Sequence, residues 1–228
     1  MSERIAAVLF DFGGVFTDSP FEAVAAYGAE LGMSAQEVTA TVFGSYEQDG
    51  DHPWHQLERG EVTLESARQS ILSLGHSQGR EIDIYDLFAR MAAGNAGADS
   101  KAPLVERVRQ LKREGYATGI ITNNVAEFGD GWRGLIPVDE LFDFVVDSSS
   151  VGIRKPDPRI FHLALERLDS IPAAQAVFLD DYQANVDAAR KLGLQAITVT
   201  ADVHSTIRDL DQALQAAGSP VESPSGRR

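Results

Sequence analysis

The sequence contains no cysteine, and it is short of basic residues. Without cysteine there can be no disulfide framework, no cysteine-ligated zinc or iron–sulfur site and no thiolate nucleophile. The 20 Lys and Arg residues face 34 Asp and Glu residues, which gives a formal net charge of -14. Nucleic-acid binding and docking on an anionic membrane both need a basic surface, so the acidic balance argues against both.

Long apolar runs are also missing. No stretch approaches the roughly 18 apolar residues that a membrane-spanning helix needs. The apolar start from Ile5 to Phe16 is interrupted by Asp11 and is followed by no cleavage-like site, which makes it a poor signal peptide. We therefore expect a soluble, cytoplasmic protein. Its 228 residues can form one or two domains and bury a core without disulfides.

Five short apolar runs are typical of strands that are buried on both faces of a parallel sheet. They lie at residues 5–10, 117–121, 142–146, 176–179 and 196–199. Helical patterns follow at residues 102–114, 158–168 and 185–192. Alternating strands and helices predict an α/β fold with a doubly wound parallel sheet.

Residues 17–100 break this alternation, because they contain helical patterns and no convincing strand. Ser34 opens a capping box with Glu37. Thr63 is placed to cap a second helix, and residues 84–91 form a third. This part of the chain is therefore expected to be a small all-helical domain.

The expected domain organisation is an α/β core, residues 1–16 and 101–217, interrupted by the helical insert of residues 17–100. The insert contains 14 acidic and 4 basic residues, and its net charge of -10 is most of the imbalance of the whole chain. Residues 218–228 are rich in Gly, Pro and Ser and are expected to be disordered.

Ligands of open α/β sheets bind beyond the carboxyl ends of the strands. The first, second and fourth predicted strands are followed there by residues that can bind ions, namely Asp11, Gly13, Gly14, Thr122, Asn123, Asp180 and Asp181. Lys155 stands just before a further helix and is a candidate for the same site, with a solvated surface charge as the alternative. Carboxylates suit a hard divalent cation, whereas a hydroxyl, backbone amides and an ammonium suit the oxygens of an anion.

This set of groups fits phosphoryl transfer to an aspartate. A carboxylate can form an aspartyl-phosphate. It can approach a phosphate dianion only when the charge is neutralised, which is the task of Mg2+ and a lysine. The pair of Asp180 and Asp181, together with Asp11, would be enough for Mg2+, which takes one or two carboxylates besides phosphate oxygens and waters.

Four short motifs carry these residues in the order Leu9–Val15, Ile120–Asn123, Arg154–Asp157 and Phe178–Asp181. In this order they resemble the motifs of the haloacid dehalogenase-like hydrolase superfamily, and the resemblance covers the chain to about residue 217. The helical insert between the first two motifs is similar to the C1 cap of subfamily I. Leu179–Arg190, and Trp54–Glu61 in the insert, are similar to the branch that contains the N-terminal phosphatase domain of soluble epoxide hydrolase.

The resemblance implies a Rossmann-like core and a Mg2+-dependent phosphatase of a small phosphorylated metabolite. It implies Asp11 as the nucleophile and Lys155 as the residue that stabilises the phosphoryl charge. The implied metal ligands are Asp11, the backbone carbonyl of Gly13, Asp181, and Asp180 directly or through water. The implied phosphate-binding residues are Thr122, the amide of Asn123, and Lys155.

One position departs from the family pattern. Phosphatases of this family usually carry a second Asp two positions after the nucleophile, where it protonates the leaving oxygen and activates the hydrolytic water, a step typically worth about 10²–10⁴-fold. Here that position is Gly13. Asp18, His52 or His55 could substitute, or the chain could be a phosphate-binding pseudoenzyme.

Three alternative protein classes fit the sequence less well. A 2-haloacid dehalogenase also has an aspartate nucleophile but needs no metal, so the pair of Asp180 and Asp181 argues against it. A phosphonate hydrolase of the superfamily tolerates a small residue at Gly13 but needs a cap lysine, and residues 17–100 contain none. A receiver-type signalling domain has its acidic pair first in the chain and no helical insert.

A few further residues have ordinary structural explanations. Trp54 is expected in the core, His52 and His55 as surface or capping groups, and Asn185 in a structural role. The sequence indicates neither the identity of the substrate nor the oligomeric state.

Overall fold

The computed structural model describes residues 4–94, 100–169 and 171–216, and its strands form one five-stranded parallel sheet in the order β3-β2-β1-β4-β5. The strands are β1 (Ala7–Phe10), β2 (Ala117–Thr122), β3 (Phe144–Asp147), β4 (Ala176–Asp180) and β5 (Gln195–Thr198). The register pairs Ala7 of the central β1 with Ala117 of β2 and with Ala176 of β4, so these three strands share one carboxyl edge. The predicted doubly wound parallel sheet is confirmed.

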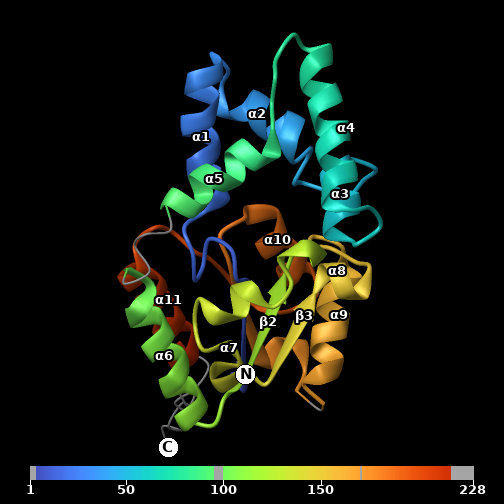
Figure 1. Cartoon of the computed structure of the whole chain (residues 1–228). Coiled ribbons are helices and arrows are strands. Elements are labelled where there is room, and N and C mark those ends of the chain that lie inside the picture. Colours follow the sequence, from blue (N-terminus) through green and yellow to red (C-terminus); the bar gives the residue numbers. More distant parts are fainter. Residues whose placement is uncertain (1–3, 95–99, 170, 217–228) are drawn as a thin grey trace, which may run out of the picture.

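Helices cover both faces of this sheet (Figure 1). The core helices are α6 (Ala102–Arg113), α7 (Val138–Leu141), α8 (Ser148–Val151), α9 (Pro158–Arg167), α10 (Gln183–Lys191) and α11 (Val203–Ala216). Val8 and Phe10 of β1 face α6, α7 and α11, whereas Ala7 and Leu9 face α9 and α10. Because successive side chains of a strand point to opposite faces, the continuous apolar run of β1 is buried on both sides.

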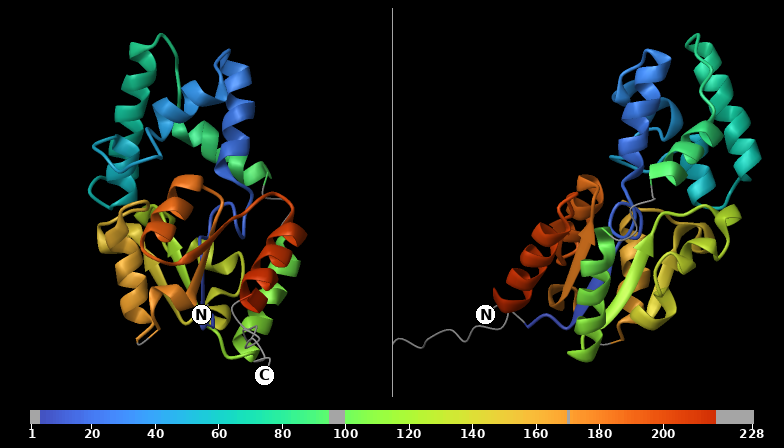
Figure 2. Two further views of the ribbon diagram at one scale, coloured as in Figure 1. Left: turned by 180° about the vertical axis from the view of Figure 1, so that it is seen from behind. Right: turned by 60° about the vertical axis from the view of Figure 1, so that its left-hand side comes forward.

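Five helices form a separate layer over the carboxyl edge of the sheet (Figures 1 and 2). They are α1 (Pro20–Leu31), α2 (Ala35–Val42), α3 (Pro53–Glu58), α4 (Leu64–Ser77) and α5 (Ile84–Gly94), and they are called the helical layer below. Its own apolar core includes Val38, Trp54 and Ile71, and Val125 of the segment after β2 joins it. In the described part of residues 17–94 every regular element is a helix, as the sequence predicts.

The helix caps predicted at Ser34 and Thr63 are confirmed. Ser34 and Glu37 form the capping box of α2, and the Thr63 hydroxyl accepts a hydrogen bond from the Ser66 N–H at 3.2 Å. Helices α1 and α3 were not predicted, because α3 spans only six residues and α1 is rich in alanine, which blurs the apolar stripe. Helix α11 was missed as well.

Several boundaries differ from the expected ones. Strand β3 begins at Phe144 instead of residue 142, because Phe142 ends α7. Helix α10 begins two residues earlier than expected, at Gln183. Short 3-10 turns, η2 (Ala126–Phe128) and η3 (Gly131–Gly134), follow β2, and η4 (Ala173–Gln175) precedes β4. The expected disorder of residues 218–228 lies outside the described residues.

None of the helices in the described part of the chain combines the length and the apolar character needed to span a membrane.

Candidate active site

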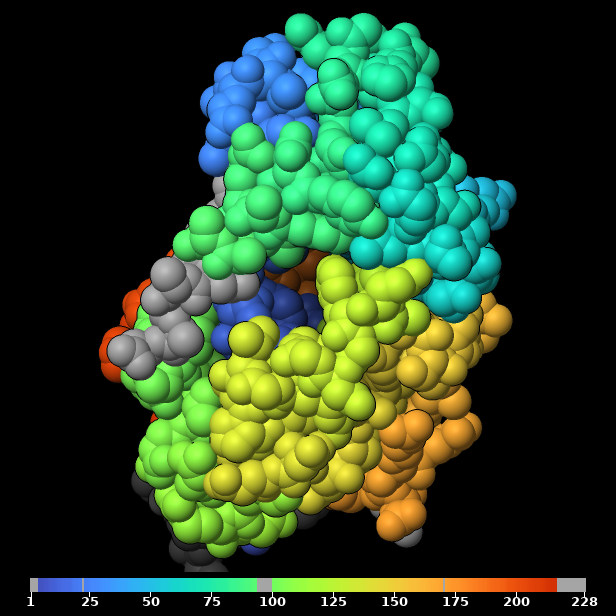
Figure 3. Space-filling view, in the orientation of Figure 1, coloured from blue at the N-terminus to red at the C-terminus, as the bar shows by residue number. Residues whose placement is uncertain are grey.

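The predicted site residues lie at the carboxyl edge of β1, β2 and β4, beneath the helical layer. Asp11 follows β1 directly, Thr122 is the last residue of β2, and Asp180 is the last residue of β4. Figure 3 shows the molecular surface hollowed between the helical layer and the segment after β2, with the blue start of the chain at the bottom of the hollow. The topology therefore places the first, second and fourth motifs around one hollow.

Lys155 lies between two of the predicted carboxylates. Its Nζ is 2.7 Å from Oδ1 of Asp11 and 2.7 Å from Oδ2 of Asp180, and its side chain is 1% exposed. The alternative that Lys155 is a solvated surface charge is therefore wrong. Burial lowers the pKa of Lys155, but Asp11 and Asp180 outweigh it and hold this pKa above its ordinary value. The side chain is a buried ammonium.

Asp180 is fixed by more than this ion pair. It is completely buried, and Oδ1 accepts a hydrogen bond from the Tyr182 N–H at 2.8 Å. The side-chain amide of Asn185 donates to both Asp180 oxygens at 3.1 Å. The structural role expected of Asn185 is thus a specific one, since it orients a carboxylate at the site.

Asp181 packs against the backbone of the first motif. Its Oδ2 accepts a hydrogen bond from the Ser19 hydroxyl at 2.7 Å. A Cβ on Gly14 would lie 2.0 Å from the same oxygen, and the φ of Gly14 is +72°. Only glycine allows both this backbone conformation and this close approach.

Three carboxylates meet at this edge with one ammonium. One oxygen from each of Asp11, Asp180 and Asp181 can be chosen so that all three lie within 4.8 Å of one another. Burial and then the charge of Asp180 raise the pKa of Asp181 to about 6. Burial also raises the pKa of Asp11 well above its ordinary value, although Lys155 opposes this. A bound cation would relieve the repulsion, and an all-oxygen set of carboxylates fits Mg2+.

Asn123 holds the backbone of Lys155. Its Oδ1 accepts a hydrogen bond from the Lys155 N–H at 2.8 Å, and its Nδ2 donates to the Lys155 carbonyl at 3.1 Å. Thr122 is 4% exposed, and its hydroxyl lies 3.4 Å from the Asn123 carbonyl. The second and third motifs are therefore joined, whereas phosphate binding by Thr122 and Asn123 stays a prediction.

Gly13 differs from its neighbour Gly14. A Cβ built on Gly13 meets no atom within 4 Å, and its φ lies outside the left-handed range. The backbone therefore leaves room for a side chain at the position of the family's acid/base.

The two histidines considered as substitutes lie in the helical layer. The Nδ1 of His52 accepts a hydrogen bond from the Trp54 N–H at 3.2 Å and so caps α3, as expected, and Trp54 lies in the core, as expected. The surface position expected of His55 is wrong: it is 2% exposed, with Nδ1 3.7 Å from Asp49. Burial lowers the pKa of each histidine to about 4, so neither is a proton donor at neutral pH.

Three residues near the site were given no role by the sequence analysis, namely Ser19, Glu58 and Arg154. Arg154 stands in the third motif beside Lys155, which was a usable signal. Glu58 is the last residue of α3, and Ser19 directly precedes α1. The sequence pattern does not reveal how these helices pack on the sheet, so neither residue could be placed at the site.

Comparison with known proteins gives consistent matches. The family model of the haloacid dehalogenase-like hydrolases matches residues 5–193. The chain is 29% identical to bifunctional epoxide hydrolase 2 of Rattus norvegicus, over 93% of this chain and 39% of that protein. It is also 29% identical to the sesquiterpene phosphatase astK of Aspergillus oryzae, over 93% of this chain and 98% of that protein.

Among solved structures, the L-2-haloacid dehalogenase RSc1362 matches with a TM-score of 0.63 and 20% identity, over 93% of this chain and 99% of that one. This likeness shows a shared fold. The chain spans only 18% to 39% of the length of four mammalian relatives that it matches.

Proposed function

The chain belongs to the haloacid dehalogenase-like hydrolase family, as its four motifs predict, and on this premise we propose that it is a Mg2+-dependent phosphatase of a small phosphorylated metabolite. Residues 1–16 and 101–217 would be the catalytic core, and residues 17–100 the cap that sets specificity. The similarity to a phosphatase over almost the whole of both chains supports this proposal.

The observation that carries it is the charge of the buried cluster. Among the described residues, the ion pairs recorded for the cluster of Asp11, Asp180 and Asp181 all involve one ammonium, that of Lys155, which contacts Asp11 and Asp180. Buried like charges are retained at sites where a ligand offsets their repulsion. A dehalogenase would have no use for this excess of carboxylates, whereas a phosphatase needs the cation that they bind.

The chain's residues have distinct tasks in this reaction. Asp11 attacks the phosphorus, the bond to the leaving oxygen breaks, and an aspartyl-phosphate forms on Asp11. The backbone of Lys155 is held by hydrogen bonds to the Asn123 side chain, and its ammonium lies close enough to Asp11 to stabilise the charge of the phosphoryl oxygens. Mg2+ bound by Asp11, Asp180, Asp181 and the carbonyl of Gly13 would neutralise the approaching dianion. Water then cleaves the aspartyl-phosphate and releases inorganic phosphate.

The absence of an acid at Gly13 favours some substrates over others. An alkyl alcohol leaves slowly unless it is protonated, whereas an acyl or aryl oxygen leaves readily as an anion. We therefore expect acyl or aryl phosphates to be hydrolysed faster than alkyl phosphates. The net charge of -10 on the insert also favours monophosphates with a neutral or cationic remainder over polyphosphates.

The test is a phosphatase screen with and without Mg2+ that includes acyl phosphates, sugar 1-phosphates, lipid phosphates and p-nitrophenyl phosphate. We expect hydrolysis that stops when Mg2+ is chelated and that Asp11→Asn abolishes. Asp139→Asn, a change on the exposed surface, is the matched control and should retain full activity. Steady hydrolysis by Asp11→Asn would refute the proposal.

The same experiment separates the alternatives. Halide release from 2-haloacids without metal would identify a dehalogenase. Tight binding of fluoroaluminate with Mg2+, without turnover of any of these phosphates, would identify a phosphate-binding pseudoenzyme.

A further inference from the structure

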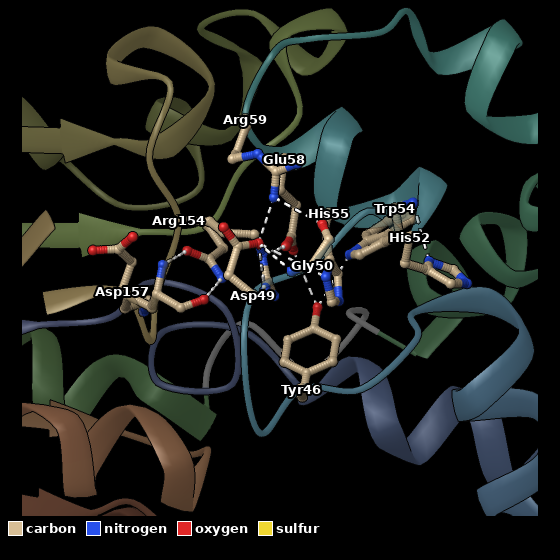
Figure 4. Close-up of polar contacts among 12 residues, drawn as sticks. Tyr46, Asp49, Gly50, His52, Trp54, His55, Glu58, Arg59, Arg154 and Asp157 are labelled. Atoms are coloured by element: carbon tan, nitrogen blue, oxygen red, sulfur yellow. Dashed lines mark hydrogen bonds and ion pairs between the residues drawn. The ribbon is translucent and has the colours of Figure 1, made fainter. Parts of the chain in front are cut away.

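A second buried charge pair links the helical layer to the candidate active site (Figure 4). Arg154 is completely buried, and its Nε donates to Oε2 of Glu58 at 2.6 Å. Glu58 is the last residue of α3 and is itself 3% exposed. Among the described residues, neither terminal nitrogen of Arg154 has a hydrogen-bond partner, although one of them lies 3.6 Å from Oδ1 of Asp49, so Glu58 makes the closest contact with this guanidinium.

The Glu58 carboxylate is held in place by an aromatic side chain. Its Oε1 accepts a hydrogen bond from the Tyr46 hydroxyl at 3.1 Å, and this hydroxyl accepts one from the indole N–H of Trp54 at 3.1 Å. The ring of Tyr46 also lies 5.1 Å from the guanidinium of Arg154. In Figure 4 the labelled side chains of Tyr46, Glu58 and Arg154 converge from separate segments.

The backbone of Glu58 makes a second contact with the core. Its carbonyl accepts a hydrogen bond from the Ser148 hydroxyl at 2.6 Å. The same hydroxyl accepts a hydrogen bond from the Asn124 N–H at 2.9 Å. Gly60, just after α3, approaches so closely that a Cβ there would lie 2.5 Å from the Ser149 carbonyl.

Both contacts of Glu58 lead to the phosphate side of the site. Arg154 directly precedes Lys155, the ammonium beside Asp11. Asn124 directly follows Asn123, whose side chain holds the Lys155 backbone. The metal side differs, because Asp180 is oriented by Asn185 of the core and Asp181 by Ser19.

We propose that Glu58 is a positioning residue that, through Arg154 and Ser148, sets Lys155 and the Thr122–Asn124 segment in place for the phosphoryl group. The inference rests on the proposed phosphatase function for its consequence but not for its geometry. The set of Tyr46, Glu58, Ser148 and Arg154 is called the Glu58 tether. Through it, α3 of the helical layer completes the phosphate side of the site, whereas the metal-side carboxylates are oriented by Asn185 of α10 and by Ser19, which precedes α1.

The first test is hydrogen exchange of the 228-residue chain carrying Glu58→Gln, which keeps the size of the side chain and removes its charge. We expect faster amide exchange at residues 122–125 and 152–155 and unchanged exchange in β4. Glu61→Gln is the matched control, since Glu61 lies just beyond α3, is exposed and pairs with Arg59. Unchanged exchange at both segments would overturn the proposal, and so would a uniform rise throughout the chain, which indicates lower stability alone.

The second test is inhibition of p-nitrophenyl phosphate hydrolysis by inorganic phosphate. In Glu58→Gln we expect the inhibition constant for phosphate to rise about 10- to 100-fold, while the Mg2+ concentration that gives half-maximal activity stays the same. A change in folded fraction alone would alter the rate but neither constant. An equal weakening of Mg2+ and phosphate would overturn the division into two sides.

A double variant separates positioning from adhesion. Glu58→Leu with Arg154→Met replaces the pair by apolar side chains, which often restores stability. We expect the melting temperature to return toward the wild-type value while the weak inhibition by phosphate persists. Full recovery of both would show that the pair only attaches the helical layer. If the wild type neither hydrolyses nor binds phosphate, the proposed function fails, and hydrogen exchange alone decides on the tether.

Discussion

The two buried charge clusters of this molecule differ in their balance. At the candidate active site, the ammonium of Lys155 contacts Asp11 and Asp180, and Asp181 is the third carboxylate of the cluster. Burial raises the pKa values of Asp11 and Asp181. At the Glu58 tether, two carboxylates, those of Glu58 and Asp49, meet two guanidiniums, those of Arg154 and Arg59. The first cluster has an excess of two negative charges, and the second has none.

This difference separates a binding role from a positioning role. A buried ion pair that is complete in itself asks for no further ligand, and its main effect is to fix the relative position of the groups that it joins. In an incomplete cluster, one with excess negative charge, the carboxylates repel one another until a cation or protons neutralise them. The balance of charge is therefore a better guide to a candidate metal site than the number of buried charged groups.

The largest effect that we expect is on the Mg2+ affinity of the incomplete cluster, and two adjacent glycines test it. Gly14→Ala would push its Cβ into Asp181 at a φ of +72°, whereas Gly13→Ala meets open space. Because displaced ligands or their supports typically cost 10- to 100-fold in metal affinity, we expect Gly14→Ala to weaken Mg2+ binding by about that factor. Gly13→Ala is the matched control, and calorimetric titration with Mg2+ measures both.

Equal Mg2+ affinities of the two alanine variants would contradict the assignment of Asp181 as a ligand. A folded Gly14→Ala protein is needed for this comparison, and far-ultraviolet circular dichroism verifies it. Asp181→Asn provides an independent check, because it removes the same ligand without changing the backbone.

A smaller effect is expected when the incomplete cluster receives one more carboxylate. Gly13→Asp has room for its side chain and would restore the general acid that the family usually has there. We expect hydrolysis of alkyl phosphates to rise by about 10-fold, while aryl phosphates change little, because only the alkyl leaving group needs the proton. Steady-state kinetics on one substrate of each kind measures this, with Gly13→Ala as the control.

No gain in a folded Gly13→Asp variant would mean either that another group already supplies the proton or that a step other than chemistry limits the rate.

The sequence predicted the sheet and the residues at its edge because both depend on local signals. Apolar runs predicted the strands. The acidic residues that follow Phe10 and Leu179 predicted the carboxylates of the site. The Glu58 tether could not be predicted, because it depends on how α3 is seated on the core, and Glu58 and Arg154 lie 96 positions apart. The burial of His55 was not predicted for the same reason. A single histidine on a six-residue helix does not indicate which other parts of the chain pack against it.

The smallest expected effect is on the pH dependence of folding stability. Acid should change the contributions of the two regions to this stability in opposite directions. His52 and His55, beside the tether, have pKa values lowered to about 4, chiefly by burial and then by neighbouring positive charge. The unfolded chain, with histidine pKa values near 6.5, therefore binds more protons than the folded protein between about pH 6.5 and 4. Their contribution to stability is complete above this window and is lost as the pH falls through it.

Asp181 acts in the other direction. Its pKa of about 6 lies above that of an unfolded aspartate, so acid favours the folded state through this group and partly offsets the histidines. Melting temperatures measured in chelator between pH 7.5 and 5 should therefore fall more steeply in Asp181→Asn than in the wild type. They should fall less steeply in His52→Asn with His55→Asn, where Asn at position 52 can still cap α3. We expect differences of a few degrees. Parallel curves for the three proteins would mean that neither cluster changes its protonation on unfolding, and the contrast between the two regions would then rest on geometry alone.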